Sequence, residues 1–143
     1  LEENRETQCD KWYENPFVIW YFFSRALSSV SIEAGDIILP RLQATKPAHI
    51  LDIALTILVQ LKWQQTPQPE TLIELLNGQL DSGAWPPAAI CHGGRRRRPG
   101  GGFDLPKRDT PYWGSEELTT AFCIEALTLC KRIYDLKSFN NLK

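Results

Sequence analysis

The sequence contains no methionine, no Cys-x-x-Cys pair, and no apolar run near the roughly 20 residues that cross a bilayer. Because the chain lacks methionine and begins at Leu1, we expect a piece of a longer protein. Four cysteines without close pairing favour reduced thiols in an intracellular, cytoplasmic protein. No signal-like segment opens the chain, and the sequence predicts no transmembrane segment.

Net charge is also nearly absent. The chain has 16 Lys and Arg against 17 Asp and Glu, which leaves a formal net charge of -1. Such a balance provides no overall field to steer the protein toward nucleic acid or an anionic membrane. With 143 residues, 43% of them hydrophobic, the chain has the size and composition of one globular domain. We therefore expect a single domain over residues 1–143.

Strand patterns are scarce, since no stretch alternates apolar and polar residues for more than a few positions. Three long segments, 15–30, 46–63 and 114–136, are instead apolar over most of a helical circumference. Two shorter amphipathic segments, 34–43 and 69–80, lie between them. The pattern predicts an all-α fold of helical hairpins, in which long inner helices alternate with shorter outer ones.

Capping and breaking residues refine these helices. Asn15 precedes Pro16 at the start of the first inner helix, and Ser115 precedes two glutamates at the start of the third. A polar cap, a first-turn proline and early acidic residues are typical of helix starts. Pro40 is expected to interrupt the first outer helix.

Residues 86–114 predict a long loop, because they hold five of the ten prolines and six of the nine glycines. Within it stand Arg95, Arg96, Arg97 and Arg98. Four guanidinium groups could clamp a diphosphate through paired hydrogen bonds. The glycine-rich, self-repelling composition favours a solvated, disordered loop over this binding site. A nucleic-acid interface is disfavoured, because no aromatic residue is interleaved with the arginines.

The stretch QLDSGAW places Gln79, Gly83 and Trp85 in a Gln-x3-Gly-x-Trp pattern. This pattern resembles the QW motif of squalene-hopene cyclases and related class II terpene cyclases, and the segment TPYWGSEELTTAFCIEAL is similar to the helix that follows that motif. Those enzymes, like the β-subunits of protein prenyltransferases, are α/α toroids of inner and outer helices. The resemblance implies about half of such a toroid here. It also implies that Gly83 forms a tight turn, that Trp85 covers the corner, and that Gln79 caps the next inner helix and stacks on Trp85.

The chemistry of those enzymes is not visible in this chain. Neither the DxDD motif of class II cyclases nor the DDxxD motif of class I synthases occurs, and the zinc ligands of prenyltransferases cannot be placed. The adjacent Cys91 and His92 lack the second pair that a zinc site needs, so we expect no metal and no cofactor. The resemblance implies binding of an isoprenoid or its diphosphate and leaves catalysis uncertain.

A second hypothesis is a non-catalytic helical-repeat module that binds a protein or lipid-like partner. Half a toroid leaves an apolar face open, and such a face must be covered by a missing part of the same chain, a second copy or another protein. A DxDD motif outside this segment would favour the enzyme, whereas its absence favours the module.

Weak catalytic candidates lie on the polar stripe of the second inner helix. His49 and Asp52 are one helical turn apart and could form an acid tuned by its neighbour. Tyr21, Arg25 and Glu125 on the flanking inner helices are candidate lining groups for a substrate. A stripe that simply meets water explains the same pattern. The aromatic residues of 12–23 could likewise line a terpenoid pocket, but core packing explains them more simply and is the favoured interpretation.

Overall fold

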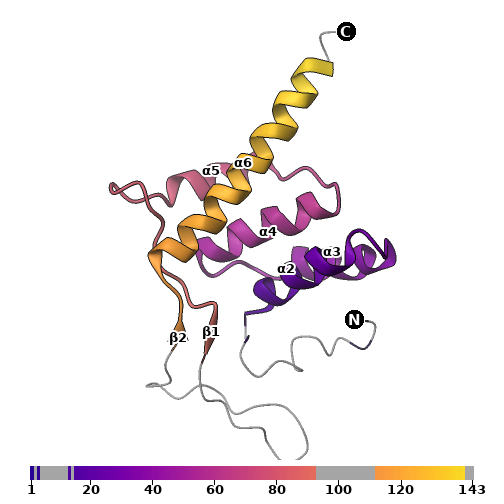
Figure 1. The fold of residues 1–143 in the computed structure, drawn as a ribbon, viewed down its shortest axis with the longest axis horizontal. Helices are drawn as coiled ribbons and strands as arrows, with labels where there is room; N and C mark the ends of the chain where they lie inside the picture. Colours follow the sequence, from indigo (N-terminus) through magenta and orange to yellow (C-terminus); the bar gives the residue numbers. More distant parts are fainter. Residues whose placement is uncertain (2, 4–12, 14, 93–111, 141–143) are drawn as a thin grey trace, which may run out of the picture.

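The computed structural model describes residues 1, 3, 13, 15–92 and 112–140, the last six of them by their backbone alone. In this part of the chain five helices follow one another: α2 (Pro16–Leu27), α3 (Glu33–Ala44), α4 (Ile50–Lys62), α5 (Pro69–Asn77) and α6 (Glu116–Asn140) (Figure 1). The all-α prediction is confirmed. One small antiparallel pair, β1 (Cys91–His92) and β2 (Tyr112–Trp113), was not predicted and joins the two ends of the long proline- and glycine-rich segment.

The helices begin where the capping residues predict. The Asn15 side chain accepts a hydrogen bond from the Phe17 amide at 2.9 Å, and Pro16 occupies the first helical position. The Ser115 hydroxyl accepts one from the Leu118 amide at 3.2 Å, directly before α6. These bonds satisfy first-turn N–H groups that have no partner inside the helix.

The predicted interruption at Pro40 is wrong, because α3 continues through it to Ala44. Pro40 lies on the exposed side of the helix, whereas Ile38 and Leu42 are buried in the core. Packing of that buried side compensates for the backbone donor that proline lacks. Gly35 on the same helix lies so close to α4 that a Cβ atom there would stand 2.6 Å from Cε3 of Trp63.

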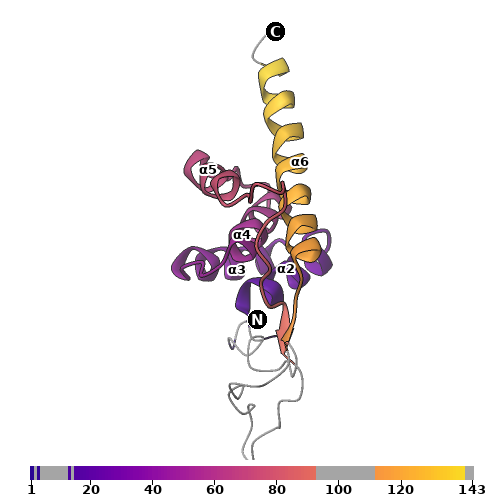
Figure 2. The same cartoon turned by 90° about the vertical axis from the view of Figure 1, so that its left-hand side faces the viewer.

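The centre of the domain is α4, which contacts α2 and α6 most extensively and also packs against α3 and α5 (Figures 1 and 2). Its start is bonded to the start of α2 through Asn15 and Asp52, and its end to the end of α2 through Trp63 and Ser24. The two helices therefore run in the same direction, and α3, which connects them in the sequence, runs in the opposite direction.

The same arrangement repeats with α5 and α6. The Tyr134 hydroxyl of α6 donates to the carbonyl of Pro67, just beyond the end of α4, so α6 also runs in the direction of α4. The last turns of α6 project past the rest of the domain (Figures 1 and 2). The helical-hairpin repeat is thus present, whereas closure into a toroid stays a prediction.

Candidate functional site

The corner that resembles a QW motif joins α5 to α6 through Trp85. This side chain is 3% exposed, and its indole N–H donates to the Leu75 carbonyl of α5 at 2.7 Å. Its backbone N–H donates to the Thr120 hydroxyl of α6 at 3.0 Å. Trp85 therefore fills the junction between the two helices and is bonded to both.

The turn before Trp85 depends on Gly83, whose φ of +85° is a conformation that other residues rarely adopt. The Leu80 amide donates to the Ala84 carbonyl at 2.8 Å, and the Gly83 amide donates to the Leu80 carbonyl at 2.8 Å. The expected turn is confirmed. Gln79 was expected to cap the next inner helix, α6. Its Nε2 instead donates to the Gly83 carbonyl at 2.6 Å and closes this turn. The first turn of α6 is capped by the Ser115 hydroxyl.

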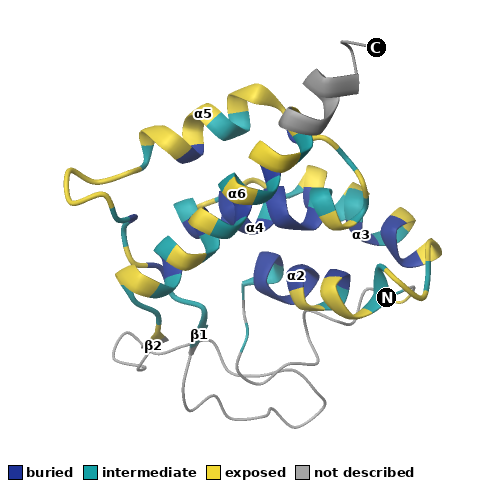
Figure 3. Cartoon of the chain, turned by 45° about the horizontal axis from the view of Figure 1, so that its top comes forward, coloured by how far each residue is buried: buried dark blue, intermediate teal, exposed yellow. Residues whose placement is uncertain are grey.

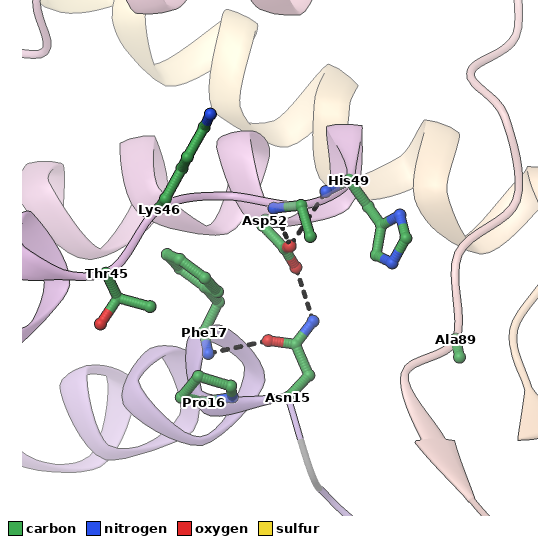
Figure 4. A pocket seen from close by; sticks show the side chains of 9 residues that line it. Asn15, Pro16, Phe17, Thr45, Lys46, His49, Asp52 and Ala89 are labelled. Atoms are coloured by element: carbon green, nitrogen blue, oxygen red, sulfur yellow. Dashed lines mark hydrogen bonds between the residues drawn. The ribbon is translucent and has the colours of Figure 1, made fainter.

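Asp52 is buried, with 2% of its surface exposed, and each of its carboxylate oxygens is hydrogen-bonded (Figure 4). Oδ1 accepts from Nδ2 of Asn15 at 2.5 Å, and Oδ2 accepts from the amides of Ala48 at 2.9 Å and His49 at 3.1 Å. The exposed His49 ring points away from the carboxylate in Figure 4. The residue thus ties the starts of α2 and α4 together, and its described bonds are those of a structural carboxylate.

A pocket of about 320 Å³ opens beside this carboxylate. Its lining includes Lys46, His49 and Ala89, and Asn15 and Phe17 contribute from the start of α2 (Figure 4). Since the Asp52 oxygens already accept bonds from the protein, the groups left to meet a solute here are the exposed Lys46 and His49.

The rest of the polar stripe on α4 does not meet water at its side-chain oxygens. Thr56 Oγ1 and Gln60 Oε1 are buried and have no hydrogen-bond partner in the described part of the chain. Buried, unpaired oxygens are costly in a domain core. These two oxygens are therefore enclosed by the fold, although Thr56 and Gln60 are half-buried as whole residues and His49 is exposed.

The predicted lining groups Tyr21, Arg25 and Glu125 come together between α2 and α6. The Tyr21 hydroxyl, on a side chain only 1% exposed, donates to Oε2 of Glu125 at 3.3 Å and accepts from Nη1 of Arg25 at 3.0 Å. Burial raises the pKa of the Tyr21 hydroxyl above its usual range, and the Arg25 hydrogen bond opposes that rise. The hydroxyl thus stays protonated between an acceptor and a cation.

The aromatic residues of 12–23 divide between core and surface. Phe17, Trp20 and Tyr21 are buried, whereas Phe22 is 42% exposed. Tyr13, Ile19, Phe22 and Phe23 line a second pocket of about 260 Å³, which we call the aromatic pocket. The rings of Tyr13 and Phe22 lie 5.6 Å apart at their centroids. Core packing therefore accounts for Phe17, Trp20 and Tyr21, whereas a terpenoid pocket stays a prediction.

The aromatic pocket was not assigned to particular residues from the sequence. The signal lay in the spacing of Ile19, Phe22 and Phe23, because positions i, i+3 and i+4 share one side of a helix. Arg25 follows Phe22 by three residues and is exposed; it is not among the residues that line the pocket, and its Nη1 donates to the Tyr21 hydroxyl.

Several predicted groups lie outside the described residues. Arg95, Arg96, Arg97 and Arg98 are among them, and so is the side chain of His92. Within the described ranges, no three His, Cys, Asp or Glu side chains are grouped to hold a metal ion. Of the helices in those ranges, none combines the length and hydropathy required to span a bilayer.

No protein-family model, curated protein or solved structure matches this chain. The likeness of residues 79–85 to a QW motif therefore remains a resemblance. Evidence for a function therefore comes from the contacts of the corner and from the residues that line the two pockets.

Burial makes the thiols of α6 poor nucleophiles. Cys123 is fully buried, and desolvation raises its pKa from the usual 9 to about 12; burial also raises the pKa of Cys130. We expect a thiol reagent at mildly alkaline pH to modify both residues only after denaturant is added, as measured by mass spectrometry of the peptides. Comparable labelling of the native chain would contradict this burial.

The same shift makes stability depend on pH. Above about pH 9 the unfolded chain releases the Cys123 proton while the folded chain retains it, so the free energy of unfolding should fall as pH rises toward 12. Cys123→Ala should reduce this fall when unfolding is measured across the alkaline range.

Proposed function

We propose that this domain binds the apolar end of an isoprenoid in the aromatic pocket on α2. The observation that carries the proposal is the lining of the pocket, which consists of Tyr13, Ile19, Phe22 and Phe23. Its volume of about 260 Å³ exceeds the roughly 150 Å³ that suffices for a benzene ring, so a branched hydrocarbon end fits. Concave, aromatic-lined pockets are the usual form of small-molecule sites.

Arg25 supplies the polar end of this site. It is exposed, its Nη1 donates to the Tyr21 hydroxyl at 3.0 Å, and it stands one turn beyond Phe22. A guanidinium held in place loses less conformational entropy when it binds a diphosphate than a free one does. An isoprenoid whose hydrocarbon end fills the aromatic pocket would thus meet a cation along α2.

The proposal is one of binding and not of catalysis. Asp52, the acid that the sequence singled out, already accepts hydrogen bonds from Asn15, Ala48 and His49. Both carboxylate oxygens of Asp52 are thus engaged in hydrogen bonds that hold the helix starts together. The terpene cyclase-like character of the domain would then rest on its helical repeat and on the Gln79, Gly83 and Trp85 corner.

Phe22→Ala should weaken binding of farnesyl diphosphate, geranylgeranyl diphosphate and farnesol about tenfold or more in calorimetric titrations, because each ligand loses an aromatic wall. Phe22 is 42% exposed, so the variant should keep its fold. Trp113→Ala, which removes a 64% exposed aromatic side chain from β2, is the matched control and should bind all three ligands normally.

Arg25→Gln should weaken the two diphosphates and leave farnesol unchanged. Absence of binding by all three ligands, or equal binding by the wild type and the Phe22 variant, would contradict the proposal. A second candidate function, the non-catalytic helical-repeat module, is favoured by a separate observation, the exposed apolar side chains of α5.

A further inference from the structure

Helix α5 buries one apolar side and exposes another. Figure 3 shows α5 as mostly exposed with a short buried part. Leu75 is fully buried and packs into the core, whereas Ile73 is 56% exposed, Leu76 51% and Leu80 40%. Only scattered single apolar residues are ordinary on a protein surface, whereas neighbouring ones mark interaction sites. We refer to Ile73, Leu76 and Leu80 as the α5 row.

Ile73 and Leu76 lie at i and i+3, the spacing of one helix side, and Leu80 follows beyond the end of α5 at Asn77. Helical bonding continues past the end of α5, because the Gly78 amide donates to the Glu74 carbonyl at 3.1 Å and the Gln79 amide donates to the Leu76 carbonyl at 3.1 Å. Leu80 is in turn held by its amide bond to Ala84 at 2.8 Å. The row thus consists of two side chains on one side of α5 and a third held in the turn that follows this helix.

Acidic side chains border this row. Glu70 and Glu74 on α5 and Asp81 after it are all exposed, and no Lys or Arg occurs between Lys62 and Arg95 in the sequence. The surface thus combines exposed apolar side chains with negative charge. Such a border repels an anionic lipid surface and attracts a cationic partner.

We propose that α5 binds an amphipathic helix of a partner protein, one that carries apolar side chains at i, i+3 or i+4, and i+7 with Lys or Arg beside them. Helices with this pattern bind through their apolar side, and the flanking charges set orientation and association rate. A row of three side chains provides a small contact area, which is typical of transient interactions. The site is separate from the aromatic pocket, so either proposal can fail alone.

The probe is a synthetic, amidated helical peptide of about 18 residues, with Leu at the stated spacing and Lys at the flanking positions. It should bind the full chain in fluorescence anisotropy, and binding should weaken as salt rises. Ile73→Ser combined with Leu76→Ser should weaken it about tenfold or more. Glu70→Gln combined with Glu74→Gln should weaken it and flatten the salt dependence.

The matched control is Val30→Ser combined with Glu33→Gln, which removes a 74% exposed apolar side chain and an exposed acid away from α5 and should bind the peptide normally. A peptide with Glu in place of Lys should not bind. Equal binding by the Ile73 and Leu76 variant, or binding of the Glu peptide, would overturn the proposal. A wild-type dimer in sedimentation that becomes monomeric in the Ile73 and Leu76 variant would also overturn the proposal, because a second copy of the chain would then occupy the α5 row.

Discussion

Trp85→Ala is expected to lower the free energy of unfolding by about 3–5 kcal/mol, the range for loss of a large buried aromatic side chain. Trp85 is 3% exposed, and its removal would also leave the Leu75 carbonyl without the indole donor at 2.7 Å. Since small domains have about 5–15 kcal/mol of stability in total, the variant should be close to unfolding. Urea denaturation followed by circular dichroism measures the effect.

Two further variants separate packing from hydrogen bonding at this corner. Trp85→Phe retains much of the buried surface but loses the indole N–H, so it should cost less than the alanine variant and still leave the Leu75 carbonyl unpaired. Trp113→Ala, at 64% exposure, should change stability by less than about 0.5 kcal/mol. A loss well below 1 kcal/mol for Trp85→Ala would mean that this residue does not hold α5 to α6.

Asp52→Ala should destabilise the domain by about 3 kcal/mol, because it leaves three hydrogen-bond donors at the helix junction without their charged acceptor. The affected donors are the side-chain amide of Asn15 and the backbone amides of Ala48 and His49. His49→Ala is the matched control. Its side chain is exposed and its backbone N–H is retained, so urea denaturation should show little change.

The comparison also separates a structural carboxylate from a catalytic pair. A structural Asp52 predicts a large stability loss for Asp52→Ala and almost none for His49→Ala. An Asp52 variant that unfolds at the same urea concentration as the wild type would contradict the structural role.

Much of the fold could be predicted from local patterns. Helical periodicity located all five described helices, and Asn15 and Ser115 were identified as caps because capping involves only neighbouring residues. The turn at Gly83 was expected from the resemblance of residues 79–85 to a QW motif. Pro40 was misjudged because its effect depends on how the rest of α3 packs, which no local pattern contains.

The candidate site was predictable only in part. Tyr21, Arg25 and Glu125 were identified as lining groups, and they do meet, across 104 residues of sequence between Tyr21 and Glu125. The role of Asn15 as the partner of Asp52 was missed, since 37 residues separate them and the contact exists only where the starts of α2 and α4 lie side by side.

The sequence by itself determined which segments are helical and where α2 and α6 begin, because periodicity and capping act within a few residues. Only the tertiary structure decided which side of each helix meets which neighbour. A helix that is apolar nearly all round, such as α4, does not indicate from its own residues where its partners lie. For that reason packing alone assigned Asp52 to the helix junction, Phe22 to an open pocket and the α5 row to the surface.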